Sequence, residues 1–157
     1  MYEKSFLLRT FSPEKDVPNV KLCRRLKRLG YPQDGGGWYW IIYHDDDGDR
    51  YQLVLERERD KKFWNMLKNC SEDYREVIKA PTIGEMGWWL SFHWTSSKGR
   101  VFYSMPFDKG FICESIDKDG FIDEFIETKS ETEADARAKM LIKLLEGGFI
   151  QFSIPKK

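Results

Sequence analysis

The segment from Ser130 to Gly148 carries the most complete helix signal in the chain. Ser130 and Glu133 have the spacing of a capping box, and Thr132 is a competing N-cap, so either residue can begin the helix. The apolar residues that follow recur with the period of one helix face: Ala134, Ala138, Leu141, Ile142 and Leu145. Gly147 and Gly148 supply the left-handed backbone at which helices commonly end. This signal constrains the fold and carries no chemistry of its own.

Two further helices are predicted upstream. The first opens at Asp16, Val17 and Pro18, with the proline near the first helical position, and ends at Gly30. The second begins at Ala80-Pro81-Thr82, where Thr82 and Glu85 have capping-box spacing. Gly84 and Gly87 each weaken a helix by roughly 1 kcal/mol relative to alanine, so this second helix is expected to be short. The segment 60–69 has a weak helical pattern and fits either a short helix or a loop.

Strand patterns alternate with turn signals through the middle of the chain. Trp38 to Tyr43 is aromatic and branched on both faces, so we expect a strand that is covered on both sides. The turns Asp45 to Asp49 and Asp119-Gly120 are expected to close hairpins. Strands are predicted at 38–43, 51–55, 92–94, 101–105, 111–116 and 121–126, with weaker candidates at 6–11, 76–79 and 149–154.

Grouped strands and helices indicate an α+β fold, in which an antiparallel sheet of about five or six strands packs with two or three helices. A chain of 157 residues fits one domain, so we expect a single two-layer domain spanning 1–157. At this size a domain buries roughly two-thirds of the surface that its unfolded chain exposes, so it needs no disulfides.

The overall composition excludes several classes. Twenty-six basic and twenty-six acidic residues cancel, so no global charge attracts nucleic acid or membrane, and any such binding needs a local patch. No apolar run approaches the ~18 residues of a membrane span. The cysteines Cys23, Cys70 and Cys113 are odd in number and widely spaced, which favours reduced thiols. A cytoplasmic protein without a membrane anchor is expected.

The chain carries no recognisable catalytic, cofactor or metal motif. Asp45, Asp47 and Asp49 are spaced like calcium ligands, but Arg50 stands where an EF-hand needs glycine, so a hairpin turn is the better interpretation. His44 and His93 have no partner at zinc spacing, and no serine lies in a nucleophile elbow. We therefore expect no catalytic residue, no cofactor and no metal.

Two candidate binding features remain. Four basic residues share one face of the first helix, which is the usual footprint of phosphate binding and also the normal solvated face of such a helix. The six tryptophans fit core packing or a binding surface, and the adjacent Trp88 and Trp89 cannot both point inward. The candidate binding surface comprises Lys21, Arg24, Arg25, Arg28, Trp88 and Trp89.

Three blocks in this order resemble a widespread group of small uncharacterised proteins encoded by phages and prophages. The blocks are Lys21–Tyr31 running into Gly37–Trp40, then Ala80–Glu85, then Glu133–Ile150. The chain departs from the group around 88–94, where tryptophans replace an expected Leu-Pro turn. The resemblance implies a cytoplasmic accessory protein of phage origin and transfers no activity or catalytic residue.

Three functions follow as hypotheses. The first is a non-enzymatic interaction protein whose partner is a host or phage protein. The second is a nucleic-acid binder that uses the basic face of the first helix. The third is an enzyme with an unfamiliar site involving His93 and carboxylates. The sequence leaves the partner and the oligomeric state open.

Overall fold

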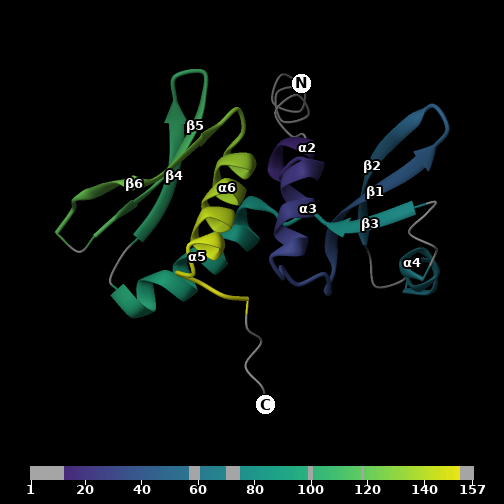
Figure 1. The fold of residues 1–157 in the computed structure, drawn as a ribbon, viewed down its shortest axis with the longest axis horizontal. Helices are drawn as coiled ribbons and strands as arrows, with labels where there is room; N and C mark the ends of the chain where they lie inside the picture. The colour runs from purple at the N-terminus through teal and green to yellow at the C-terminus, as the bar shows by residue number, and fades with distance from the viewer. Residues whose placement is uncertain (1–12, 57–60, 70–74, 99–100, 118, 153–157) are drawn as a thin grey trace, which may run out of the picture.

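The computed structural model describes residues 13–56, 61–69, 75–98, 101–117 and 119–152 (Figure 1). Helices alternate irregularly with strands along these segments. In chain order the elements are α2 (Pro13–Asp16), α3 (Val20–Arg28), β1 (Gly37–Asp45), β2 (Gly48–Glu56), α4 (Lys61–Lys68), β3 (Arg75–Lys79), α5 (Ile83–Lys98), β4 (Val101–Phe107), β5 (Gly110–Ile116), β6 (Ile122–Ser130) and α6 (Glu133–Glu146). The fold is α+β, as predicted.

The strands form two antiparallel sheets and not the single sheet that was predicted. The first sheet has the order β2-β1-β3 and the second sheet has the order β4-β5-β6. In Figure 1 the two sheets lie on opposite sides of the molecule, with α3 and α6 between them. The expectation of one two-layer arrangement is therefore not confirmed. The physical reason is that α5 separates β3 from β4 in the chain, and the helices α3 and α6 fill the space in which the two sheets would otherwise pair.

The first sheet is covered on both faces. On one face Ile42 and Ile78 pack with Cys23 of α3. On the other face Tyr39 and Ile41 pack with residues of α4, among which Trp64 is only 1% exposed. The prediction of a strand covered on both sides is confirmed. The open question of segment 60–69 is resolved by α4, because a helix lets Trp64 and Leu67 reach the same sheet face.

The main core is built around α6. Its buried residues are Ala134, Ala136, Ala138, Met140, Leu141 and Leu144, a broader set than the predicted single stripe. The predicted Ile142 and Leu145 are only partly buried. The helix is buried widely because it packs against the second sheet, α3 and α5 together. Three alanines in its first turns allow these neighbours to approach closely.

α3 and α6 have the expected kinds of capping residues, but the position at which each helix begins differs from the first prediction. Thr132 is the N-cap of α6 and accepts a hydrogen bond from the Asp135 backbone N–H at 3.1 Å, so the competing cap is correct and Ser130 belongs to β6. Asn19 is the N-cap of α3, which places Pro18 just before the helix and not within it. Gly148 has the predicted left-handed backbone, with φ of 74°.

The predicted strand at 92–94 is wrong, because α5 continues through these residues to Lys98. Met86 and Leu90 anchor the helix in the core, and no glycine or proline interrupts the sequence between Gly87 and Gly99. Aromatic residues have only slightly lower helix propensity than alanine, so an anchored helix extends through them. The predicted capping box is present: Thr82 Oγ1 accepts a hydrogen bond from the Glu85 N–H at 3.2 Å.

The remaining strand predictions are mostly confirmed. The hairpin β1–β2 turns at Asp46 and Asp47, where a two-residue loop connects paired Asp45 and Gly48. Asp117 Oδ1 accepts two backbone hydrogen bonds in the turn between β5 and β6. Segment 149–152 is not a strand; instead Ile150 is buried in the main core. The predicted elements at 6–11 and 153–154 lie outside the described residues.

Candidate binding groove

A groove of about 670 Å³ runs between α3, α6 and the end of β6. Basic residues of the two helices line it, together with Leu22 and Ile142, which are partly buried against the main core. Thr128 and Ser130 contribute hydroxyl groups from β6. We call this the basic groove, lined by Asn19, Lys21, Leu22, Arg25, Arg28, Thr128, Ser130, Lys139, Ile142, Lys143 and Glu146.

Three of the four predicted basic residues of α3 line this groove. Lys21, Arg25 and Arg28 lie four and then three residues apart, so they share one face of α3. Lys139 and Lys143 lie four residues apart on α6 and face the same groove. Among the described lining residues, five cationic side chains therefore face a single carboxylate.

That carboxylate, Glu146 of α6, pairs with Arg25 of α3 at one end of the groove. The Nε of Arg25 donates to Glu146 Oε1 at 2.7 Å, and its Nη2 donates to the same oxygen. Both side chains are more than 40% exposed, so this pair contributes little to stability.

Arg24, the fourth predicted residue, does not line the groove. It lies about 100° around the helix from Arg25, which turns it toward β3 of the first sheet. There its Nη2 pairs with Glu76 Oε2 at 3.0 Å, and both side chains are partly buried. Arg24 is therefore separated from the other three basic residues, because the neighbouring strand supplies a carboxylate at the edge of their shared face.

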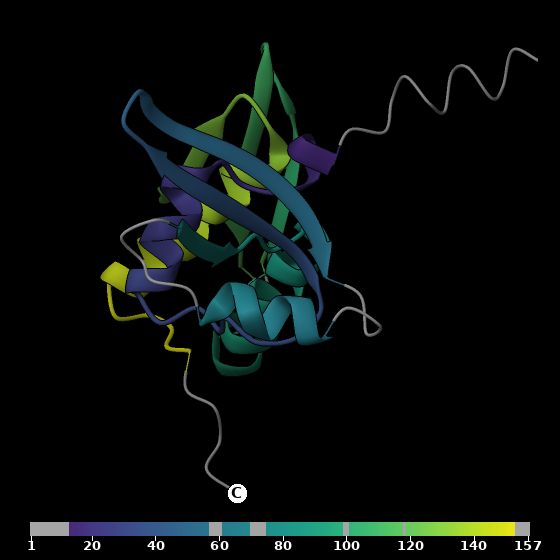
Figure 2. The same cartoon turned by 90° about the vertical axis from the view of Figure 1, so that its right-hand side faces the viewer.

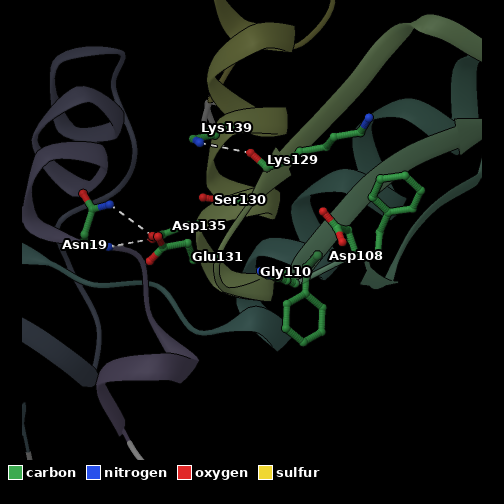
Figure 3. Close-up of a pocket in the computed structure, with 11 residues that line it drawn as sticks. Asn19, Asp108, Gly110, Lys129, Ser130, Glu131, Asp135 and Lys139 are labelled. Atoms are coloured by element: carbon green, nitrogen blue, oxygen red, sulfur yellow. Dashed lines mark hydrogen bonds between the residues drawn. The ribbon is translucent and has the colours of Figure 1, made fainter.

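A pair of hydrogen bonds fixes the two helices at the other end of the groove. Asn19, the N-cap of α3, donates its backbone N–H to Asp135 Oδ1 at 2.8 Å and its side-chain amide to Asp135 Oδ2 at 3.1 Å (Figure 3). Asp135 belongs to the first turn of α6, where the helix dipole favours a carboxylate. Polar contacts between α3 and α6 thus lie at both ends of the groove.

A second pocket of about 560 Å³ adjoins the basic groove and shares Asn19, Ser130 and Lys139 with it. Figure 3 shows it between α6 and the turn joining β4 to β5. Its charges are mixed, since three lysines and three carboxylates line it: Lys109, Lys129, Lys139, Asp108, Glu131 and Asp135. Phe107, which is 45% exposed, lies beneath the Lys129 ammonium at 4.7 Å.

The two adjacent tryptophans point in different directions, as predicted. Trp88 is 55% exposed, whereas Trp89 is partly buried against the main core. The ring of Trp89 makes edge contacts with Tyr31 and Phe152 at centroid distances of 6.1 and 4.8 Å. Trp89 therefore packs segment 149–152 against the core, and of the two tryptophans only Trp88 is exposed at the surface. Neither residue lines the basic groove.

A small polar cavity of about 160 Å³ lies between α5, α6 and the second sheet. Arg137 lines it and donates to Ser104 Oγ at 2.9 Å and to the Ile83 carbonyl at 3.1 Å. Burial raises the pKa of the neighbouring Cys113 thiol to about 12. A thiol with this pKa is protonated at neutral pH, so it is a poor nucleophile. Burial likewise raises the pKa of Cys23.

The other candidates of the sequence have ordinary structural settings. His44 Nδ1 lies 2.8 Å from Asp49 Oδ1 in the β1–β2 hairpin. The side chain of His93 and the residue Cys70 lie outside the described part of the chain. Within the described residues, no group of three or more His, Cys, Asp or Glu side chains is arranged to hold a metal.

Lys139 and Lys143 are the groove residues that sequence reasoning missed. Their four-residue spacing on the exposed side of α6 was visible in the sequence. The spacing alone did not predict a groove, however, because nothing in the local sequence shows that α6 packs beside α3. The groove exists only through that tertiary contact.

Comparison of the chain with protein-family models, curated proteins and solved structures finds no match in any of the three. None of the helices described here has the length and apolar character required to cross a membrane.

Proposed function

We propose that the protein is a non-enzymatic interaction module that binds an acidic segment of a partner protein in the basic groove. The observation that carries the proposal is the convergence of five cationic side chains from two helices on one concave surface. The lining of the groove also includes Leu22 and Ile142, which suits a segment that combines carboxylates with apolar side chains. Complementary charge of this kind steers partners and selects among them.

The adjoining pocket favours a polypeptide over nucleic acid as the ligand. A nucleic-acid strand carries a negative phosphate at every nucleotide, so a strand following both pockets would pass three carboxylates. A polypeptide needs its acidic residues only in the basic groove. It can present basic or apolar residues to Asp108, Glu131 and the exposed Phe107.

Nucleic-acid binding is a second candidate, because one observation favours it. The basic groove leads directly to an exposed phenylalanine, Phe107, and aromatic rings beside a cationic groove are platforms on which single-stranded bases stack.

The phage resemblance and the cytoplasmic location remain part of the proposal. With that origin, the partner would be a host or phage protein.

Fluorescence anisotropy with two defined probes separates the candidates. One probe is a glutamate-rich peptide with interspersed leucines, and the other is a single-stranded oligothymidylate of equal length. At low ionic strength we expect the peptide to bind, and the double variant Lys21→Glu/Arg28→Glu to weaken binding by about tenfold or more. Lys27→Glu is the matched control, because Lys27 lies on α3 but does not line the groove.

Each outcome decides between the proposals. Binding of oligothymidylate without the peptide would replace the proposal with the second candidate. If the double variant and the control bind the peptide equally weakly, the peptide-binding site lies outside the groove. If neither probe binds the wild-type protein at low salt, the groove is not a site for anionic macromolecules.

A further inference from the structure

The outer edge of β2 is an open edge of nine residues. β2 forms one border of the first sheet, and within the described residues it pairs only with β1 (Figure 2). It spans nine residues, of which Gly48 to Gln52 are all exposed. An open edge is a template for pairing with another strand, so natural proteins usually shorten it or interrupt it with lysine, proline or a bulge.

The other described sheet edges are short or carry lysine or proline, as in β6, which also spans nine residues and contains Lys129. The opposite border of the first sheet, β3, is only five residues long. In the second sheet, the border strand β4 contains Pro106. β2 contains neither lysine nor proline and carries the exposed apolar side chains Tyr51 and Leu55. The charged residues of β2 are Asp49, Arg50 and Glu56. A nine-residue edge without lysine, proline or a bulge, whose charges are of both signs, suggests that a partner strand covers it.

The β1–β2 register shows which backbone groups face outward. Asp45 and Gly48 flank the two-residue turn, so they form a hydrogen-bonded pair, and such pairs then alternate along the hairpin. Residues 48, 50, 52, 54 and 56 of β2 therefore bond inward to β1. The N–H and C=O groups of Asp49, Tyr51, Leu53 and Leu55 face away from the sheet.

We propose that the protein forms a symmetric dimer in which β2 pairs antiparallel with β2 of a second copy, with Leu53 opposite its own symmetry mate. In this register Leu53 and the pair Tyr51–Leu55 are hydrogen-bonded positions, which are the positions with outward backbone groups. The two sheets would then join into one six-stranded sheet. A closed two-fold pairing of this kind uses the same edge of both copies and leaves no second β2 edge open.

Charge complementarity selects this register and this partner. Centring on Leu53 places Arg50 directly opposite Glu56 of the second copy, twice by symmetry. Centring the pairing on Gln52 instead places Arg50 opposite Val54, and the ionic pairs are lost. Opposite charges directly across an antiparallel pair stabilise it, and like charges destabilise it. The Arg50 side chain is 73% exposed; its Nε contacts Asp45 at 2.6 Å. Its guanidinium also lies over the Tyr43 ring of β1, 5.7 Å from the centroid, so pairing with Glu56 of a second copy requires the Arg50 side chain to rotate away from β1.

Sedimentation of the full chain tests the dimer with a complementary pair of variants. Arg50→Glu alone and Glu56→Arg alone each place like charges opposite one another, so each is expected to dimerise about tenfold more weakly than the wild type. An equal mixture of the two variants restores both pairs in a heterodimer. The mixture is therefore expected to sediment as a dimer at concentrations at which each variant alone is a monomer.

The mixture is also the folding control, because variants that failed to fold could not form the heterodimer. A backbone test uses Tyr51→Pro, which removes an outward N–H without removing a bond to β1, against Tyr51→Ala, which keeps that N–H. The proline variant is expected to be the weaker dimer. A wild-type protein that remains monomeric up to on the order of 100 µM would overturn the proposal. Dimerisation that is insensitive to both charge variants would place the interface elsewhere.

Discussion

Cys113 is a small buried residue of β5 whose setting predicts a pH dependence. Only 1% of it is exposed, and it packs in the main core against residues of α6. Burial disfavours the thiolate and raises the pKa of Cys113 to about 12 from the 9.0 of an exposed thiol. Between these two values the unfolded chain loses this proton and the folded chain keeps it. The contribution of Cys113 to stability is therefore fully present below pH 9 and is lost as pH rises toward 12.

Replacing Cys113 with alanine should make the protein less sensitive to alkaline pH. From pH 8 to pH 10.5 we expect the free energy of unfolding to fall by on the order of 1–2 kcal/mol less in Cys113→Ala than in the wild type. Urea denaturation at the two pH values measures this difference. Cys23 and the tyrosines titrate in both proteins, so the comparison isolates one thiol. Equal losses in the two proteins would show that Cys113 is solvated in the folded state.

The cysteines and the basic residues of α3 show which properties of single residues could be predicted from the sequence. The odd number and wide spacing of the cysteines favoured reduced thiols, and both buried cysteines of the described residues are free. The basic residues of α3 were also found from local spacing. Their division into groove residues and Arg24 was not, because Glu76 approaches from a strand more than fifty residues away. Local patterns identify candidate groups, whereas tertiary partners decide which of them remain available.

At the scale of elements, α3, α6 and the glycines at their ends were predicted, whereas the Asn19 cap of α3 and the length of α5 were not. α3 and α6 both begin at a capping side chain, and both end at a glycine with positive φ, Gly30 and Gly148. These signals are local in the sequence. The predicted length of α5 was wrong, because its two glycines were considered only for their low helix propensity. One of them, Gly87, has a tertiary role that a sequence alone does not show.

Gly87 and Gly84 of α5 therefore predict opposite effects of the same substitution. A Cβ at Gly87 would collide with Arg137 Nη1, whereas a Cβ at Gly84 meets nothing closer than Thr82 Oγ1 at 3.9 Å. Gly87→Ala should displace an arginine bonded to Ser104, Ile83 and Glu133, and destabilise the protein by about 1–3 kcal/mol. Gly84→Ala should stabilise it by up to about 1 kcal/mol. Thermal or urea denaturation of both variants provides the measurement, and stabilisation by both would mean that Arg137 moves aside freely.

At the scale of the whole molecule, α3 is the element that joins the two sheets. Its Cys23 belongs to the cluster under the first sheet, while its Leu26, one turn further, belongs to the main core with α6. The division into two sheets was not predictable, because strand patterns specify that strands exist and not which of them pair. The arrangement in which two helices lie between the sheets also creates the basic groove. Fold and candidate site therefore depend on one contact between α3 and α6.

This shared helix predicts that the chain unfolds as one unit, in keeping with a single domain. Leu144→Ala removes a buried side chain of α6 that has no place in either cluster of the first sheet, and should cost about 2–5 kcal/mol. If unfolding is cooperative, hydrogen exchange should report the same loss in the core amides of β1 and β5, because both are protected by global unfolding. Met66→Ala is the control, since Met66 is 59% exposed and should cost little. Loss of protection in β5 with unchanged protection in β1 would divide the chain into two units. In that case the α3–α6 contact would be a docking interface, and ligands of the basic groove would control how the two units associate.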